Sequence, residues 1–422
     1  MRLLITNIAQ LATMAGVAAK DGVGVTWDDL GLVTDAAVLI EDGAIRYAGP
    51  AAALPKHGPP DRAIDAEGAV ALPGLIDPHT HPCWVGSRHD EFAMRAEGKT
   101  YREINAAGGG IRASVRHVRR ATPDELAAAC TGRLARMFAL GVTTVEAKSG
   151  YALNTEGELR MLRAIAQAAA RTDQTIVPTF LGAHAIPPEF DGDRDGYTEL
   201  IVREMLPAVA AENLATFCDA FVEPGFFTLE QGRRILTAAK DLGFRLRVHA
   251  DEFEPFGGAQ LAAELGATSA DHLMAVDDAG IRALAAAGVT ATLLPATTLF
   301  LGQSNYAPAR KLLDAGCRVA LATDFNPGSS YTENLQLVLT LACTALHMTI
   351  AEAWAGVTYN AARALLLHES RGALLPGRRA DLLLFDAPDV RAIPYHLAMS
   401  DLRWIIAGGQ LYRAPTPFAQ RA

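Results

Sequence analysis

Two histidines separated by one residue, His79 and His81, follow an apolar segment of the chain. In an extended backbone, residues two positions apart point in the same direction, so both imidazoles can reach one metal ion. This spacing alone is a weak signal, because two surface histidines often fall this close by chance. Later apolar segments, however, end in His249, His272 and Asp324. Packing does not require four histidines and one aspartate at such ends, and the set therefore predicts a metal site.

The segments that end in these residues have the pattern of strands separated by helices. Between them lie stretches rich in Ala, Leu, Glu and Arg with helical periodicity. The expected strands are 71–79, 142–147, 175–184, 216–223, 246–250, 269–272, 290–298 and 319–325. Several are apolar nearly throughout, as is typical of parallel strands buried on both faces. The alternation predicts an α/β fold, a TIM-like (β/α)8 barrel over residues 71–369, whose active-site residues follow the carboxyl ends of its strands.

Both ends of the chain have a different pattern, with short strands and tight turns. Asp42-Gly43 lies between two apolar runs near the N-terminus, and Gly408-Gly409 lies between two near the C-terminus. An Asp-Gly pair in such a position is a strong hairpin signal. We expect residues 1–70 and 370–422 to pair as one small β-sandwich domain built from both termini.

Composition narrows the class of protein. The 422 residues carry 38 Lys and Arg against 47 Asp and Glu, a net charge of −9, and half of them are hydrophobic. This excludes a disordered chain and argues against nucleic-acid or anionic-membrane binding, which needs clustered cations. The five cysteines are dispersed and form no C-x-x-C pair, which is typical of a reducing compartment. With no signal-peptide pattern and no apolar run of about 20 residues, a cytoplasmic location is expected.

Several motifs resemble those of a known family. The H-x-H after Pro-Gly-Leu-Ile-Asp, the later single histidines, the Thr323-Asp324 pair and residues 371–382 resemble the amidohydrolase superfamily. Within it, four segments in this order resemble imidazolonepropionases: Glu-Ala-Lys-Ser-Gly-Tyr at 146–151, Phe-Leu-Gly-Ala-His at 180–184, His-Ala-Asp-Glu at 249–252 and Asp-Phe-Asn-Pro-Gly-Ser at 324–329. The resemblance covers nearly the whole chain. It implies metal-dependent hydrolysis of a cyclic amide, 4-imidazolone-5-propanoate, to N-formimidoyl-L-glutamate in histidine degradation.

The resemblance also bears on the number of metal ions. Superfamily members that hold two metals usually bridge them with a carboxylated lysine at the end of the fourth strand, and the expected strand 216–223 contains no lysine. Lys148 follows the second strand and is interpreted as a structural or neighbouring ammonium group. The resemblance therefore implies one metal ion, with zinc and iron both suited to the ligands. These ligands are His79, His81, His249 and Asp324.

Three residues are candidates for the chemical step. A metal-activated water needs a proton acceptor, and Asp324 could both bind the metal and accept that proton. His272 is a candidate base or electrostatic partner, and Glu252, three residues after His249, could reach the water or a ring nitrogen. Either His272 or Asp324 could protonate the leaving nitrogen.

Substrate recognition is expected from residues around the metal motif. Arg88 lies on the segment after His81, and a guanidinium there could hold a carboxylate such as the propionate arm through two hydrogen bonds. The resemblance implies further contacts with substrate or product, and for Gly328 a contact through its backbone N–H. These contacts are expected from Tyr151, His184, Glu252, Asn326, Gly328 and Ser329.

Two alternatives share these features. A deaminase of the same superfamily would attack an aminated heterocycle and release ammonia, although Arg88 favours a substrate with an acidic arm. A catalytically inactive relative would act as a binding or assembly module, but such proteins usually lose metal ligands, and all four are present. The expected partner is a small molecule with a carboxylate arm, with no nucleic acid and no membrane, and a homodimer is a fair expectation.

Overall fold

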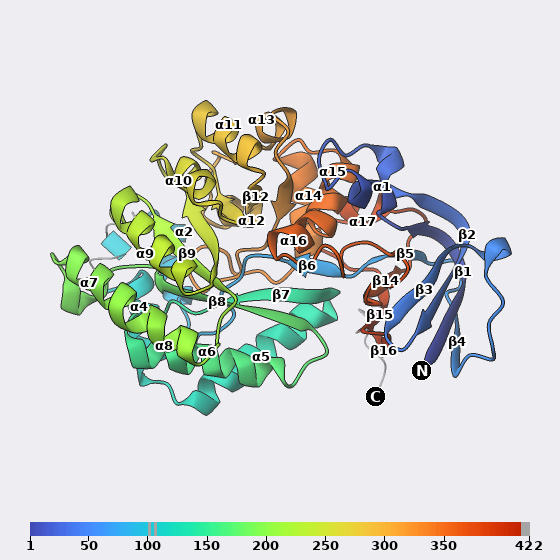
Figure 1. The fold of residues 1–422 in the computed structure, drawn as a ribbon, viewed down its shortest axis with the longest axis horizontal. Helices are drawn as coiled ribbons and strands as arrows, with labels where there is room; N and C mark the ends of the chain where they lie inside the picture. The colour runs from blue at the N-terminus through green and yellow to red at the C-terminus, as the bar shows by residue number, and fades with distance from the viewer. Residues whose placement is uncertain (100–102, 105–107, 415–422) are drawn as a thin grey trace.

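The chain forms two eight-stranded sheets. The largest hydrophobic cluster contains residues of both sheets, and a second cluster belongs to the mixed sheet. The computed structural model describes residues 1–99, 103–104 and 108–414. One sheet is an all-parallel barrel surrounded by helices, and the other is a mixed sheet made from both ends of the chain. In Figure 1 the barrel lies to the left, and the mixed sheet lies to the right with the N-terminus. The fold class expected from the sequence is therefore confirmed.

The barrel strands follow one another in chain order, and each neighbouring pair is parallel. They are β6 (Leu75–Asp77), β7 (Val142–Lys148), β8 (Thr175–Ala183), β9 (Phe217–Val222), β10 (Arg245–Ala250), β11 (Ser269–His272), β12 (Thr290–Leu293) and β13 (Val319–Leu321). Nearly every residue in them is buried, as expected for strands covered on both faces. Eight parallel strands in this order give the predicted TIM-like architecture.

The barrel closes where the segments after β6 and β13 meet. Thr80 and Phe325 form a parallel bridge, and the backbone N–H of Asp324 donates to the His79 carbonyl oxygen at 3.1 Å. At the end of β6, the Asp77 carboxylate accepts hydrogen bonds from the backbone N–H of Thr323 at 3.1 Å and from the Thr323 hydroxyl at 2.6 Å. These contacts place the end of the first barrel strand directly beside the end of the last.

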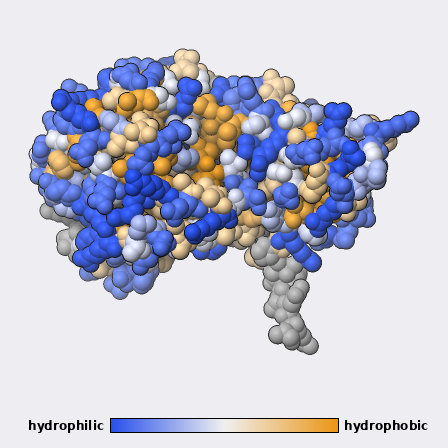
Figure 2. Space-filling model, turned by 60° about the horizontal axis from the view of Figure 1, so that its bottom comes forward, coloured by the Kyte–Doolittle hydropathy of each residue, from blue (hydrophilic) through white to orange (hydrophobic). Residues whose placement is uncertain are grey.

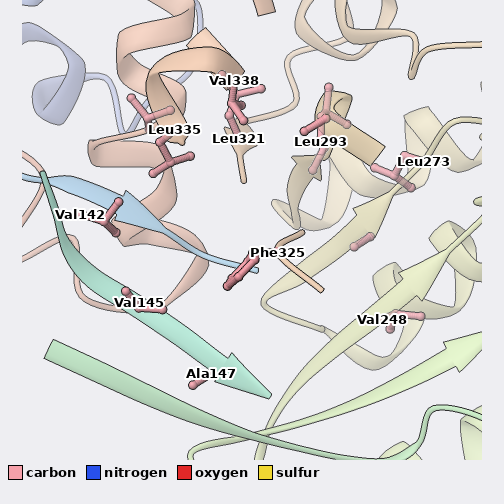
Figure 3. Packing of buried hydrophobic residues seen from close by; sticks show 14 of the residues in the cluster. Val142, Val145, Ala147, Val248, Leu273, Leu293, Leu321, Phe325, Leu335 and Val338 are labelled. Atoms are coloured by element: carbon pink, nitrogen blue, oxygen red, sulfur yellow. The ribbon is translucent and has the colours of Figure 1, made fainter. Parts of the chain in front are cut away.

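Helices cover the outside of the barrel and pack their apolar faces onto the strands. Figure 3 shows part of this core, with Val142, Val145 and Ala147 along β7, and Leu335 and Val338 on the covering helix α14. The helices of the barrel region are α2 (His89–Ala96), α4 (Ile111–Arg120), α5 (Pro123–Ala139), α6 (Thr155–Ala169), α7 (Arg194–Leu200), α8 (Leu206–Ala211), α9 (Leu229–Asp241), α10 (Gly258–Leu265), α11 (Asp278–Ala287), α12 (Pro295–Phe300), α13 (Ala309–Asp314), α14 (Leu335–Thr344), α15 (Ile350–Gly356) and α16 (Tyr359–Ala364).

Several of these helices begin at a residue whose side chain caps the first turn. Thr122 accepts from the Glu125 backbone N–H at 3.2 Å, and the Glu125 carboxylate accepts from the Thr122 N–H at 2.8 Å. Thr349 and Glu352 form the same reciprocal pair before α15. Each pair satisfies backbone groups that a helix end leaves open and so fixes where the helix starts.

The expected strand 71–79 is divided between the two sheets. Its first part belongs to β5 (Val70–Pro73) of the mixed sheet, and the barrel strand β6 begins after Gly74. A Cβ atom at Gly74 would lie 2.2 Å from Thr143 Oγ1, so only glycine lets the chain cross this close to β7.

Two expected strands also end earlier than predicted. β12 stops at Leu293, because Pro295 begins helix α12. β13 stops at Leu321, and the following segment turns sharply where Asp324 adopts a φ of 53°. Residues 295–298 and 322–325 are therefore segments beyond the strand ends, where active-site side chains of barrels lie.

The mixed sheet joins the two ends of the chain in the strand order β16-β15-β14-β5-β1-β2-β3, with β4 paired to β1. At the β2–β3 hairpin both turn residues, Asp42 and Gly43, have positive φ, as this turn type requires. The strands are β1 (Arg2–Ala12), β2 (Leu32–Glu41), β3 (Ala44–Pro50), β4 (Arg62–Asp65), β5, β14 (Leu382–Phe385), β15 (Leu402–Ala407) and β16 (Gln410–Arg413).

The remaining short elements connect the two sheets or border them. They are α1 (Ala15–Ala19), α17 (Ala392–Tyr395), three 3-10 turns at Trp27–Leu30, Ala51–Ala53 and Pro188–Phe190, and a π-helical turn at Ile201–Met205. The division into a barrel domain of residues 71–369 and a small domain of residues 1–70 plus 370–422 stays a prediction, and residues 415–422 of the latter lie outside those described.

One face of the molecule is mainly polar. Figure 2 shows one face on which hydrophilic residues predominate around a smaller apolar area near its centre. Within residues 1–99, 103–104 and 108–414, every helix is too short or too polar to cross a membrane.

Candidate active site

Four histidines and one aspartate meet at the carboxyl end of the barrel. His79 and His81 follow β6, His249 lies in β10, His272 ends β11, and Asp324 follows β13. The imidazole centroids of His79 and His249 are 4.5 Å apart, and those of His249 and His272 are 5.1 Å apart. All five side chains are buried. The structure thus brings together the residues that the sequence placed at four separate strand ends.

The free atoms of this cluster fit a metal ion. Nε2 of His79 and Nε2 of His249 are buried and have no hydrogen-bond partner among the described residues. Asp324 Oδ1 lies 3.5 Å from Nε2 of both His79 and His81. The donor atoms of His79, His249 and His272 lie within 4.8 Å of one another, and so do those of His79, His81 and Asp324. Imidazole nitrogens with one carboxylate oxygen are a donor set that zinc or iron accepts.

Electrostatics keeps the cluster ready for a cation. Burial, reinforced by nearby positive charges, holds the pKa of His79 and of His81 well below the usual value for histidine. Both imidazoles are therefore neutral near pH 7. A neutral imidazole is the form that binds metals.

The position of Asp324 is set by its neighbours and by its backbone. Thr297 Oγ1 donates to Asp324 Oδ2 at 2.7 Å, and Asn326 Nδ2 donates to the Asp324 carbonyl oxygen at 2.7 Å. A non-glycine residue with a φ of 53° costs about 1 kcal/mol or more and persists where surrounding contacts hold it, often at functional sites. His272 also has a positive φ, of 78°.

His272 in the cluster and Glu252 beside it both have strongly shifted pKa values. Burial, together with the charges of Asp324 and Glu223, raises the pKa of Glu252 well above its usual value. Burial lowers the pKa of His272 to about 3. Glu252 Oε2 lies 3.7 Å from His272 Nδ1. These shifts favour the protonated form of the Glu252 carboxyl group next to the neutral form of the His272 imidazole, a combination suited to proton donation and acceptance.

Several residues expected to bind substrate lie beside the same cluster. His184 stacks on His81 with a centroid distance of 5.1 Å, and its Nδ1 lies 2.9 Å from the Gly150 carbonyl oxygen. The Tyr151 ring is 5.2 Å from that of His184. Burial raises the pKa of Tyr151, and the positive charge of Arg88 opposes this shift.

The guanidinium of Arg88 is held in place by a carboxylate. Its Nε and Nη2 donate to Glu91 Oε1 and Oε2 at 2.8 and 2.7 Å. The third nitrogen, Nη1, would be 2.1 Å from a Cβ atom at Gly328, so the guanidinium lies directly against the Gly328 backbone. Glu91 Oε1 also accepts from the Gly110 N–H at 3.0 Å. The predicted carboxylate-binding residue is thus fixed next to the predicted product loop.

The loop after β13 is closed by its own hydrogen bonds. Asn326 Oδ1 accepts from the backbone N–H groups of Gly328 and Ser329, both at 2.8 Å. Asn326 Nδ2 also donates to Ser329 Oγ at 2.9 Å. The Gly328 N–H expected to contact the ligand therefore has an internal partner in this structure.

Sequence reasoning interpreted Lys148 as a structural or neighbouring ammonium group, but it missed the other polar side chains that adjoin the histidines, Asp219, Arg247 and Asp271. His79 Nδ1 is 2.7 Å from Asp271 Oδ2, and His249 Nδ1 is 3.0 Å from Asp219 Oδ2. Arg247 donates to Asp271 at 2.8 Å, and Lys148 donates to Asp219 at 2.8 Å. The available signal was their position: each lies on a barrel strand, inside an otherwise apolar run, where an ionised side chain requires a partner.

Comparison with known proteins identifies the family. The sequence pattern of the amidohydrolase family matches residues 70–408. The chain is 44% identical to the imidazolonepropionase of Parabacteroides distasonis, over 97% of this chain and 99% of that protein. It is 46% identical to the imidazolonepropionase of Geobacillus kaustophilus, over 97% of each. The chain belongs to the imidazolonepropionase family of amidohydrolases. Like its family, it is a hydrolase that acts on carbon–nitrogen bonds of a small cyclic amide.

Solved structures agree with the fold. The 5-methylcytosine deaminase of Klebsiella pneumoniae with 5-fluorocytosine superposes with a TM-score of 0.73 at 20% identity, over 100% of this chain and 99% of that one. Atrazine chlorohydrolase of Arthrobacter aurescens, complexed with zinc, gives 0.71 at 19% identity, over 99% and 97%. The family and the buried donor cluster together support a metal cofactor in this member of the imidazolonepropionases. The family therefore favours hydrolysis of a cyclic amide over deamination of a heterocycle, and an enzyme over an inactive binding module.

Proposed function

We propose that the chain hydrolyses 4-imidazolone-5-propanoate to N-formimidoyl-L-glutamate with one metal ion, zinc or iron, bound by His79, His81, His249 and Asp324. The observation that carries the proposal is the meeting of unpartnered imidazole nitrogens with the Asp324 carboxylate at one end of the barrel. A buried cation-binding group next to a fixed guanidinium suits a substrate with a reactive ring amide and an acidic arm.

The reaction adds one water molecule across a ring amide bond. The water oxygen bonds to the ring carbonyl carbon, the bond from that carbon to the ring nitrogen breaks, and the nitrogen takes up a proton. The ring carbonyl becomes the α-carboxylate of the product. The ring carbon between the two nitrogens becomes the carbon of the formimidoyl group. When bound, a metal ion supplies Lewis acidity and lowers the pKa of a bound water.

Asp324 is proposed to take the proton from the attacking water. Its Oδ2 accepts from Thr297, which leaves Oδ1 directed at His79 and His81, where the water would be held. The same carboxyl group is proposed to return the proton to the leaving nitrogen. His272 is proposed to stabilise the negative charge that develops on the carbonyl oxygen.

Glu252 is proposed to donate a hydrogen bond to a ring nitrogen. Glu223 accepts hydrogen bonds from the backbone N–H groups of Glu252 and Phe253, and so fixes the segment that carries Glu252. The Glu252 carboxyl group lies 3.7 Å from His272, which supports a joint role of the two side chains beside the ring.

Arg88 is proposed to bind the propionate carboxylate, with Tyr151 and His184 lining the same side. Two of its nitrogens bind Glu91, so Nη1 and the remaining N–H bonds are directed away from that carboxylate. The loop of Asn326, Gly328 and Ser329 is proposed to contact the product after ring opening. For Gly328 to donate its N–H to a ligand, Asn326 Oδ1 must first release it.

Two further expectations belong to the same proposal. A reducing, cytoplasmic location agrees with five cysteines that are all free in the structure. A homodimer is proposed as the state in solution, and analytical ultracentrifugation at two protein concentrations distinguishes it from a monomer.

The decisive experiment follows the ultraviolet absorbance of imidazolone propionate, generated enzymatically in the cuvette, with and without a chelator. The proposal predicts a metal-dependent loss of the ring chromophore and no ammonia. Ammonia release from aminated heterocycles would instead support the deaminase. Metal-loaded protein that leaves the chromophore unchanged would contradict the proposed substrate.

A further inference from the structure

We infer that Asp271 and Asp219 are positioning residues that orient His79 and His249 toward the metal, and that Arg247 and Lys148 hold these two carboxylates in place. The inference rests on the proposed metal site. It gives a role to Lys148, which is fully buried and lies outside the proposed ligand set.

The first pair fixes the proton on His79. Asp271 Oδ2 lies 2.7 Å from His79 Nδ1 and accepts a hydrogen bond from Arg247 Nη2 at 2.8 Å. A carboxylate oxygen only accepts, so Nδ1 must carry the proton, and Nε2 keeps its lone pair. His79 Nε2 is the atom without a partner that faces Asp324 Oδ1. Asp271 thus selects which nitrogen of His79 can bind a metal.

Arg247 is anchored from three sides. Besides Asp271, it donates to the Pro78 carbonyl oxygen at 2.7 Å and to the Ala364 carbonyl oxygen at 3.0 Å. Pro78 directly precedes His79. The guanidinium therefore ties the carboxylate on β11 to the backbone that carries the first histidine.

A second carboxylate lies against His249. Asp219 Oδ2 is 3.0 Å from His249 Nδ1 and accepts a hydrogen bond from Lys148 Nζ at 2.8 Å. Unlike the His79–Asp271 pair, this contact lacks hydrogen-bond geometry, and both His249 nitrogens are buried without a hydrogen-bond partner. A small rotation of the imidazole would complete the Nδ1–H···Asp219 bond and leave Nε2 for the metal, which is the role inferred for Asp219.

Lys148 also links this pair to the H-x-H segment. Its Nζ donates to Glu146 Oε1 at 2.7 Å, and Glu146 Oε2 accepts from the Thr80 backbone N–H at 3.0 Å. Thr80 lies between the two histidines of the motif. One ammonium group thus connects the support of His249 with the backbone between His79 and His81.

The charges of this network favour a bound cation. It contains three carboxylates, Glu146, Asp219 and Asp271, and two cations, Lys148 and Arg247, and all five side chains are fully buried. A network with a purely structural role would not need to contact His79 or His249. Two of its carboxylates nevertheless each have an oxygen within 3.0 Å of an imidazole nitrogen. Carboxylates that accept from metal-bound histidines fix ring orientation, and their loss typically costs 10–100-fold in metal affinity.

The test measures metal binding in the full-length protein without substrate. Asp271→Asn and Asp219→Asn keep side-chain volume but remove the charge that selects the tautomer, because an amide can present an N–H donor to Nδ1 instead. Zinc affinity is measured by competition with a chromophoric chelator. The cobalt-substituted protein adds a visible spectrum that reports the geometry of the ligands. We expect about 10–100-fold weaker zinc binding and an altered cobalt spectrum for both variants.

The matched control is Asp381→Asn, in the region of the mixed sheet. Asp381 is also a buried carboxylate paired with an arginine, since it accepts from Arg379 Nε at 3.0 Å. The control is expected to lower thermal stability while leaving zinc affinity and the cobalt spectrum as in the parent protein.

The inference is overturned if folded Asp271→Asn and Asp219→Asn bind zinc with the parent affinity and show the parent cobalt spectrum. Should the Asn variants not fold, Lys148→Arg and Arg247→Lys replace them, because each keeps a positive charge but changes its geometry. Parent-like zinc affinity in both would equally overturn it. The test does not depend on substrate. If the parent protein does not hydrolyse imidazolone propionate but the variants bind zinc more weakly, the proposed substrate is refuted and the inference stands.

Discussion

Thr297 donates its hydroxyl hydrogen to Asp324 Oδ2 at 2.7 Å, so this carboxylate keeps a single oxygen, Oδ1, directed at the histidines. Thr297 lies on α12, a helix that begins where a strand was expected. The helix after β12 therefore determines the orientation of a carboxylate after β13.

The first prediction concerns this contact. Thr297→Val keeps the shape of the side chain and removes the donor, so Asp324 can rotate and Oδ1 is no longer fixed. A hydrogen bond to a charged group is worth about 1.5–3 kcal/mol, and we expect kcat to fall at least about tenfold. Steady-state kinetics compares it with Thr298→Val, the neighbouring buried threonine, which should stay near the parent rate. Equal rates for the two variants would refute the role of Thr297.

Removing the proposed base should have a larger effect. Asp324→Asn changes volume little but cannot accept the water proton, so turnover should fall by at least about 10²- to 10⁴-fold while the circular dichroism spectrum is retained. Asp314→Asn, at an exposed position on α13, serves as the control. Turnover within a few-fold of the parent would exclude Asp324 from the proton transfer.

Arg88 should act on the acidic arm alone. In Arg88→Ala the propionate loses a charge-assisted partner, and we expect KM to rise about 10- to 100-fold. An analogue with a neutral arm should be processed equally by the variant and the parent protein. The control is Arg282→Ala, on the exposed face of α11. If the variant impairs the neutral analogue to the same extent, Arg88 does not bind the carboxylate.

Metal removal should abolish activity and lower stability. Dialysis against a chelator is expected to inactivate the enzyme, and zinc or iron should restore it. A ligand that binds only the folded state stabilises it by about 2.7 kcal/mol at 100 times its Kd, so Tm should rise when the metal is returned. Scanning calorimetry before and after reconstitution measures this rise. Full activity in protein shown to be metal-free would contradict a metal-dependent reaction.

Glu223 gives a pH-dependent contribution to stability. Burial raises its pKa from the usual 4.5 to about 7. Because the folded state favours the protonated form, this contribution is complete below about pH 4.5 and is lost as the pH rises to about 7. Glu223→Gln stays neutral and can still accept from the backbone N–H of Phe253, so the variant should match the parent at pH 4 and exceed its unfolding free energy at pH 8.

Urea unfolding at the two pH values measures this difference. Asp77, whose pKa burial also raises to about 7, is common to both proteins and cancels in the comparison. A difference between variant and parent that is the same at both pH values would contradict the assignment.

The barrel and its cluster of histidines with Asp324 were predictable because they depend on local patterns. His79 and His81 share one direction in an extended chain, and their place after an apolar strand is visible in the sequence. His272 is likewise the last residue of an expected strand, 269–272, whose bounds the structure reproduces.

The supporting contacts were not predictable, because they depend on strand register. Asp271 meets His79 across 192 positions of the chain, and only the assembled barrel brings β11 beneath the segment after β6. Gly74 is a further example. Any side chain at this position would collide with Thr143, which lies on a different strand. The pairing of Arg88 with Glu91 lies within one helical turn, and its spacing of three residues was a signal that could have been used.

The closure of the barrel between the segments after β6 and β13 has a consequence for biosynthesis. His81, near the start of the barrel, and Asp324, near its end, face each other across 3.5 Å. A nascent chain therefore contains the H-x-H motif long before it contains the carboxylate that completes the proposed ligand set. On this proposal, binding of a metal by all four ligands requires that all eight barrel strands have been synthesised, although helices α14 to α16 still follow.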